Sequence, residues 1–196
     1  ESAVAEAVAE GQHVVIMNPT MVMGPGDLNL ISGSFVLETY QRSWLTPITG
    51  GGIAVIDVRD VAAMHIAAAE QGRVGERYIL NTANYSYREW FDLIAAVLDV
   101  PRPLLQVPTV ALPAIANAVD RLRRAGVSVP IDANQVRLGG RQVHFDGSKA
   151  HRELTAPKIS MRQSLTDTYR WYRDNGYIQQ TPVSRLTTGI GNLFRK

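Results

Sequence analysis

The sequence contains no cysteine, so it can hold no disulfide framework, no thiolate nucleophile and no cysteine-ligated metal site. It also lacks an excess of one charge. Its 20 Lys and Arg residues stand against 18 Asp and Glu residues, and the formal net charge of +2 argues against a nucleic-acid partner. No secretory signal is recognisable, and the absence of disulfides is compatible with a reducing compartment. We therefore expect a cytoplasmic protein.

Long apolar runs are missing as well. The most apolar stretch, residues 104–119, is interrupted by polar residues and prolines. It falls short of the ~20 apolar residues that a membrane-spanning helix requires. We therefore expect no integral membrane segment.

Several catalytic motifs are absent. The sequence has neither the Gly-x-Ser-x-Gly turn of α/β-hydrolases nor the Gly-x-x-x-x-Gly-Lys-[Ser/Thr] loop of nucleotide triphosphatases. The glycines at 50–52 precede an expected strand, so they predict a turn and not a phosphate cradle. The spacing of the histidines favours no metal site, since they lie far apart at His13, His65, His144 and His151. No residue of this sequence is assigned a catalytic or metal-binding role.

What is present is an alternation of short apolar runs with helical segments. Hydrophobic residues make up 45% of the 196 positions, enough for a domain-sized core. The apolar runs predict strands at residues 14–17, 53–58, 77–80, 104–107 and 142–145. Helices are expected at residues 1–10, 30–44 and 113–124, after Asp60, Ser86 and Ser160, and as one turn at 148–154. This pattern indicates the α/β class.

The expected strands become sparse after about residue 100. We therefore expect a sheet-containing part at residues 1–100 and a mainly helical part at residues 101–178. Beyond them, residues 179–196 lose the periodic pattern and are expected to form a flexible tail.

The first candidate binding segment is a strand that runs into a loop. Residues 13–27 read His-Val-Val-Ile-Met-Asn-Pro-Thr-Met-Val-Met-Gly-Pro-Gly-Asp. The apolar run predicts a strand buried on both faces of a parallel sheet, and we expect Pro19 to end it because proline cannot donate to the ladder. Ligands of α/β proteins bind beyond the carboxyl ends of such strands.

A second candidate is a group of charged residues, Asp57, Arg59 and Asp60, at an expected strand-to-helix junction. The simpler interpretation is structural: Asp60 caps the helix and Arg59 forms a local ion pair. In the functional alternative, Arg59 meets an anionic or hydroxylated ligand.

Two further helix starts carry the pattern of a capping box. Ser86 is followed three positions later by Glu89, and Ser160 by Gln163. The aromatic residues of the last helix, Tyr172 among them, have helical spacing and are interpreted first as packing residues.

Four segments resemble, in their order and spacing, the extended short-chain dehydrogenase/reductase family, most closely its dihydroflavonol-reductase and NAD-dependent epimerase/dehydratase branch. They are residues 18–27, residues 56–62 (Ile-Asp-Val-Arg-Asp-Val-Ala), residues 75–81 (Gly-Glu-Arg-Tyr-Ile-Leu-Asn) and residues 146–150 (Asp-Gly-Ser-Lys-Ala). The resemblance is to the C-terminal part of the family. It implies the C-terminal portion of a Rossmann-like parallel sheet plus a small, mainly helical substrate domain.

The resemblance also implies where ligands bind. The family's loop beside the nicotinamide ring of its cofactor, NAD or NADP, corresponds to Asn18, Pro19, Thr20, Met21 and Val22. The residues that it places at the substrate are Met23, Gly24, Asp27 and Arg59.

In the family, a Tyr-x-x-x-Lys motif supplies the acid/base tyrosine and a glycine-rich loop binds the dinucleotide. By the resemblance, both would precede Glu1. The implied function is part of an NAD(P)-dependent oxidoreductase or epimerase for a small carbonyl or hydroxyl compound or a nucleotide-linked sugar. We expect the chain alone to be inactive, and its implied assembly is a homodimer. Two alternatives stay open: a non-catalytic ligand-binding or interaction module of atypical short-chain dehydrogenase type, and a fragment without independent function.

Overall fold

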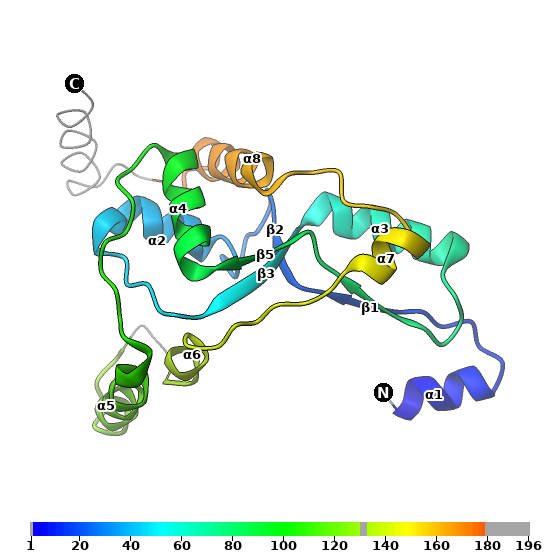
Figure 1. The fold of residues 1–196 in the computed structure, drawn as a ribbon, viewed down its shortest axis with the longest axis horizontal. Helices are drawn as coiled ribbons and strands as arrows, with labels where there is room; N and C mark the ends of the chain where they lie inside the picture. The colour runs from blue at the N-terminus through cyan, green and yellow to red at the C-terminus, as the bar shows by residue number, and fades with distance from the viewer. Residues whose placement is uncertain (1, 130–132, 179–196) are drawn as a thin grey trace. The chain divides into compact units, whose positions relative to one another are not determined.

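The structure is a computed structural model that describes residues 2–129 and 133–178 (Figure 1). Its strands are β1 (Ile16–Pro19), β2 (Met21–Met23), β3 (Gly52–Asp57), β4 (Arg77–Leu80) and β5 (Ala83–Ser86). Its α-helices are α1 (Ser2–Ala9), α2 (Ser34–Arg42), α3 (Val58–Gln71), α4 (Tyr87–Leu98), α5 (Leu112–Arg124), α6 (Ala133–Leu138), α7 (Ser148–Glu153) and α8 (Met161–Asp174). Short 3-10 helices are η1 (Ser43–Leu45) and η2 (Thr109–Ala111). The expected α/β class is confirmed, and the tail predicted at residues 179–196 lies outside the described residues.

The elements gather into two compact units that interleave along the chain. Of the described residues, unit 1 comprises 2–33, Ala54–Asn84 and Phe145–Asp174, and unit 2 comprises Ser34–Ile53, 85–129, 133–144 and 175–178. The functional division at about residue 100 stays a prediction. Within the described ranges, no helix combines the length and the apolar character needed to cross a bilayer.

Unit 1 is built on parallel strand pairs. β1 pairs with β4 from Ile16 opposite Arg77 to Pro19 opposite Leu80, and β2 pairs with β3. Helices α3 and α8 contact β2, and α7 contacts β4. The core buries apolar side chains from β3, α3, β4 and α7, namely Ile56, Met64, Ala67, Ala68, Tyr78, Leu80, Ala150 and Leu154. The removal of this surface from water holds the helices on the strands.

Strand β1 corrects the expectation for residues 14–17. It begins at Ile16 and continues through Pro19, and its apolar residues are half-buried rather than fully buried. The N–H of Ile16 donates to the carbonyl oxygen of Glu76, directly before β4, and the N–H of Thr20 donates to that of Leu80 in β4. Alternate residues of a strand point their N–H groups the same way, so the nitrogen of Pro19 points away from β4 and its missing proton costs no ladder bond.

Unit 2 contains two small helical cores. In one, α2 packs on α4, and the rings of Phe35 and Phe91 lie 5.6 Å apart. In the other, α5 packs on α6 around Leu112, Ala116, Val119, Ala133 and Val136. The predicted start of α4 is confirmed, because Ser86 and Glu89 form both hydrogen bonds of a capping box.

Two of the expected strands in unit 2 are wrong. Residues 104–107 and 142–145 each contribute only an isolated bridge, at Gln106 and Gln142. An apolar run forms a strand only when a neighbouring segment pairs with it over several residues, and these runs meet a neighbour at one position.

The helix expected at residues 30–44 begins later, at Ser34. Leu30 adopts a left-handed conformation with φ of 54°. The carboxylate of Asp27 binds the N–H groups that follow it and forms a turn where the periodicity predicted a helix.

Candidate functional site

A cavity of about 500 Å³ opens in unit 1 beyond the carboxyl ends of two parallel strands. Residues 20–27 line it together with Ile31, Ser32 and Val58. Residues 24–27 follow β2, and Val58 follows β3, which pairs with β2 from Met21 opposite Val55 to Met23 opposite Asp57. The sheet therefore brings together two segments that lie far apart in the sequence. The position and the volume of the cavity are typical of ligand sites in α/β proteins.

One lining residue of the cavity, Thr20, is hydrogen-bonded to β4. Both the N–H group and the hydroxyl of Thr20 donate to the carbonyl oxygen of Leu80, at 3.0 and 2.9 Å. The hydroxyl proton is thus held by the backbone, and the lone pairs of its oxygen can still accept a hydrogen bond.

The loop after β2 approaches the start of α3 very closely. Gly24 has φ of +148°, and a Cβ atom built on it would lie 2.5 Å from Cγ1 of Val58. Only glycine allows both this backbone conformation and this contact. The closeness of Gly24 and Val58 sets the width of the cavity at that point.

Asp27 organises the far side of the loop. Its carboxylate accepts from the N–H groups of Ile31, Ser32 and Gly33 at 3.2, 2.9 and 2.9 Å. Burial raises the pKa of Asp27, but the backbone donors, led by Gly33, outweigh it and leave the pKa below its usual value. Asp27 is therefore ionised at neutral pH, and its negative charge is used to hold the loop.

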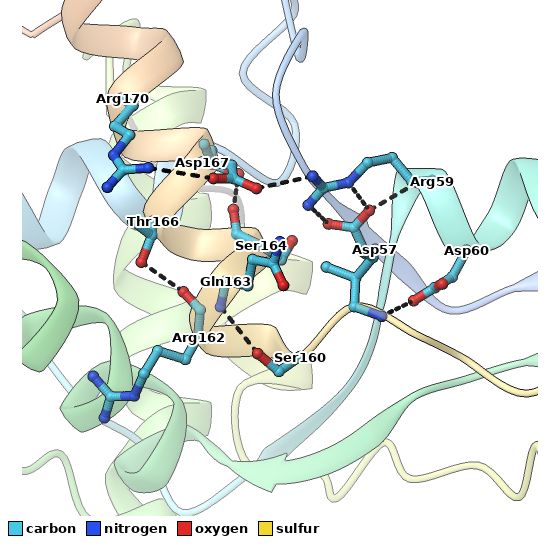
Figure 2. A network of polar contacts seen from close by, with 12 residues as sticks. Asp57, Arg59, Asp60, Ser160, Arg162, Gln163, Ser164, Thr166, Asp167 and Arg170 are labelled. Atoms are coloured by element: carbon cyan, nitrogen blue, oxygen red, sulfur yellow. Dashed lines mark hydrogen bonds and ion pairs between the residues drawn. The ribbon is translucent and has the colours of Figure 1, made fainter.

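Asp57 and Arg59 form an ion pair at the start of α3 (Figure 2). The side chain of Asp57 is fully buried and caps the helix by accepting from the N–H of Arg59 at 2.8 Å. Nε and Nη2 of Arg59 donate to the two oxygens of Asp57 at 2.8 and 2.9 Å. Burial raises the pKa of Asp57, and the hydrogen bonds from the side chain and the N–H of Arg59 outweigh it, so the pKa is lowered.

The same arginine also reaches α8. Nη1 of Arg59 donates to Oδ2 of Asp167 at 2.8 Å, so the guanidinium bridges two carboxylates (Figure 2). The hydrogen bonds to Asp57, above all, raise the pKa of Arg59. The local ion pair expected here is present, and nothing in the residue pattern indicated its extension to Asp167.

The cap expected from Asp60 is wrong. Asp57 caps α3, while Asp60 lies in the first turn and is nearly fully buried. Its two carboxylate oxygens accept from the N–H groups of Lys158 and Ile159 at 2.9 and 3.1 Å. Asp60 therefore fixes the segment that leads into α8, a role that depends on residues far away in the sequence.

The structure brings most of the predicted site residues to one cavity. Its lining includes Thr20, Met21, Val22, Met23, Gly24 and Asp27. Asn18 and Pro19 lie in β1, outside the lining, and the guanidinium of Arg59 is bound to carboxylates. Sequence reasoning missed Val58 and Ile31. The signal for Val58 was its place at the carboxyl end of the strand expected at residues 53–58, although the structure ends β3 at Asp57.

No protein-family profile matches the chain. It is 31% identical over 179 residues to a protein of Synechocystis sp. provisionally named dihydroflavonol 4-reductase, with 88% of this chain and 52% of that protein covered. A solved nucleoside-diphosphate-sugar epimerase from Pseudomonas aeruginosa aligns with 29% identity and a TM-score of 0.72, over 91% of this chain and 54% of that chain. The chain thus spans about half the length of the relatives it matches.

Solved structures of the same fold contain nicotinamide cofactors. A dTDP-glucose 4,6-dehydratase from Streptomyces venezuelae with NAD bound aligns with a TM-score of 0.62 at 22% identity, over 92% of this chain and 50% of that chain. RMD from Pseudomonas aeruginosa, complexed with NADPH, aligns with a TM-score of 0.57 at 17% identity, over 87% and 51%. In sequence and in fold, the chain thus matches about half the length of extended short-chain dehydrogenases/reductases.

Proposed function

We propose that this chain forms the nicotinamide and substrate side of an NAD(P)-dependent oxidoreductase or epimerase. The observation that carries the proposal is the cavity beyond β2 and β3. Its lining, residues 20–27, includes three residues of the segment that resembles the family's cofactor loop (20–22) and the residues that the resemblance places at the substrate. The chemistry in the site would be hydride transfer, which the bound cofactor supplies.

The residues present suit a nicotinamide ring. Met21, Val22 and Val58 offer apolar surface against which a flat ring can pack, and the oxygen of Thr20 can accept from a carboxamide. In this proposal the cofactor lies against residues 18–22, from Asn18 and Pro19 to Val22.

The substrate is proposed to lie against Met23, Gly24 and Asp27, which follow directly along the cavity wall. Asp27 contributes by shaping the loop, since its carboxylate is occupied by backbone donors. Arg59 is kept as a candidate for a polar group of the substrate, although its guanidinium is already held by Asp57 and Asp167. The proposed substrate is a small carbonyl or hydroxyl compound or a nucleotide-linked sugar.

The proposal includes a cytoplasmic location, a small-molecule substrate as the partner, no nucleic acid, and a homodimeric assembly. It also keeps the division into a cofactor-binding part at residues 1–100 and a substrate part at residues 101–178. The balanced charge supports the absence of a nucleic-acid partner, and the alternating strands and helices of the first part support the division.

The test uses two matched variants of the protein as its gene encodes it. Ile31 lines the cavity and is 74% exposed, whereas Leu28, in the same loop, is 67% exposed and lies outside the lining. We expect Ile31→Trp to lower kcat/KM at least about tenfold by occupying the cavity, and Leu28→Trp to leave it unchanged. NADPH oxidation with carbonyl compounds from acetone to 4-phenyl-2-butanone, and NAD-dependent conversion of UDP-glucose, provide the assays.

Equal activity of the two variants would refute the proposed cavity. NADPH binding followed by its fluorescence, without turnover of any compound in the panel, would instead favour the non-catalytic module. The 196-residue chain by itself serves as the negative control, because the acid/base motif implied by the resemblance is not part of it.

A further inference from the structure

The cavity wall is held from inside by one tyrosine of α8. The side chain of Tyr172 is fully buried, and its hydroxyl donates to the backbone oxygen of Asp27 at 3.2 Å. The hydroxyl also occupies the place beside Gly33 where any side chain would begin, since a Cβ atom on Gly33 would fall 1.5 Å from Oη. Tyr172 therefore contacts the loop near both of its ends.

The loop has no regular secondary structure of its own. Residues 24–33 form no helix or strand, and Leu30 holds a left-handed conformation. Leu28 and Ile31 expose most of their side chains. The position of residues 27–33 therefore depends on contacts with their inner side, among them the hydrogen bonds to the carboxylate of Asp27 and the contacts with Tyr172.

The opposite wall is tied to the same helix. Asp167, one and a half turns before Tyr172 on α8, binds Arg59, which in turn binds the helix-capping Asp57 (Figure 2). Val58, which forms this wall, lies between Asp57 and Arg59 in the sequence. Helix α8 thus holds both sides of the cavity, at Val58 through Arg59 and at the loop through Tyr172.

We propose that Tyr172 is a positioning residue that fixes residues 27–33 in the geometry that binds substrate. This inference rests on the proposed function for its effect on catalysis. Tyr172 does not line the cavity, so it acts through the backbone of Asp27 and through Gly33. Its loss should therefore raise KM for the substrate while kcat and NADPH affinity change little.

The test compares Tyr172→Phe with Tyr78→Phe. Tyr78 is equally buried in unit 1 and donates its hydroxyl to Glu153 at 2.9 Å, but it lies outside the cavity lining. Tyr172→Phe removes the hydrogen bond to Asp27, whereas Tyr78→Phe removes the bond to Glu153 and the one that the hydroxyl accepts from the N–H of Arg73. The control should therefore lower the melting temperature at least as much as Tyr172→Phe does. In Tyr172→Phe we expect about a three- to tenfold higher KM for the carbonyl compound that the wild type reduces best, and a KM near wild type in Tyr78→Phe.

A second measurement does not depend on activity. Hydrogen exchange of the Ile31, Ser32 and Gly33 amides, followed by NMR in the same two variants, should become about three- to tenfold faster in Tyr172→Phe only. If exchange changes in this way but the wild type turns over no substrate, the positioning role of Tyr172 is supported and the proposed function is refuted. Unchanged exchange and an unchanged KM in Tyr172→Phe would overturn the positioning role, whatever the activity of the wild type.

Discussion

The starts of α3 and α4 use similar side chains in different ways. At α4, Ser86 accepts from the N–H of Glu89 at 3.2 Å, and the carboxylate of Glu89 accepts from the N–H of Ser86 at 2.8 Å. At α3, Asp57 caps the helix and also holds Arg59, whose other partner, Asp167, lies 108 positions further along the chain. The hydrogen bonds at the start of α4 all lie within four residues, whereas those at the start of α3 include a partner far away in the sequence.

This difference decides what each start contributes to stability. The cap of α4 is largely exposed to water, so its hydrogen bonds replace similar ones to solvent. The carboxylate of Asp57 has no access to water and depends on Arg59 to offset its desolvation. A local cap supports one helix, whereas the Asp57 pair connects β3, α3 and α8.

Removal of the buried carboxylate gives the largest expected effect. Asp57→Ala leaves the cap of α3 and the guanidinium of Arg59 without their main acceptor, and we expect it to lower the free energy of unfolding by about 3 kcal/mol or more. The matched change at the other start, Ser86→Ala, is expected to cost about 1 kcal/mol. Urea unfolding followed by circular dichroism measures both. Equal losses would remove the distinction between the two helix starts.

An intermediate effect is expected at Asp60. Asp60→Ala leaves the N–H groups of Lys158 and Ile159 without their acceptors and should lower the free energy of unfolding by about 2 kcal/mol. Asp60→Asn keeps one acceptor oxygen and should lose less. If the alanine variant unfolds at the same urea concentration as the wild type, the connection between α3 and the segment before α8 contributes nothing measurable.

The smallest expected effect is a loss of stability at acidic pH. The pKa values of Asp57 and Glu89 are both below their usual values, at Glu89 because of hydrogen bonds from the backbone and hydroxyl of Ser86. A lowered pKa in the folded state stabilises it above the unfolded value, about 4, and this contribution is lost as pH falls through the folded value. We therefore expect the urea midpoint of the wild type to fall between pH 5 and pH 3.

The two carboxylates should differ in their share of this acid dependence. Asp57→Asn should flatten it, whereas Glu89→Gln should leave it almost unchanged because solvent screens the exposed carboxylate. A larger change in Glu89→Gln than in Asp57→Asn would show that the local cap, and not the buried pair, controls acid stability.

The elements that were predicted correctly are those defined by neighbouring residues. Strand β4 spans residues 77–80 as expected, and α5 ends at Arg124 shortly before Gly126, whose φ is +80°. The expected strands at 104–107 and 142–145 failed because a strand needs a partner that the run itself does not contain. The start of β1 was misplaced for the same reason, since its length depends on where β4 lies.

The candidate site likewise contains residues that could be predicted from the sequence and residues that only the fold brings there. Residues 20–24 and Asp27 were expected at a ligand from the resemblance and from their place after a strand, and they do line one cavity. Val58 joins them only because β2 and β3 lie side by side. Tyr172 was interpreted as a packing residue, and its burial agrees with that, but its hydrogen bond to Asp27 depends on the docking of α8.

Charge balance, the absence of cysteine, the capping box at Ser86 and the loop motif at residues 18–27 could all be recognised in the chain before any fold was known, because each depends on composition or on contacts within a few positions. The partners of the buried carboxylates could not be recognised in this way. Packing α8 and the segment before it onto the sheet brought the N–H groups of Lys158 and Ile159 to Asp60, and the carboxylate of Asp167 to Arg59. A buried carboxylate must take the hydrogen bonds that the fold places beside it, because it has lost those to water.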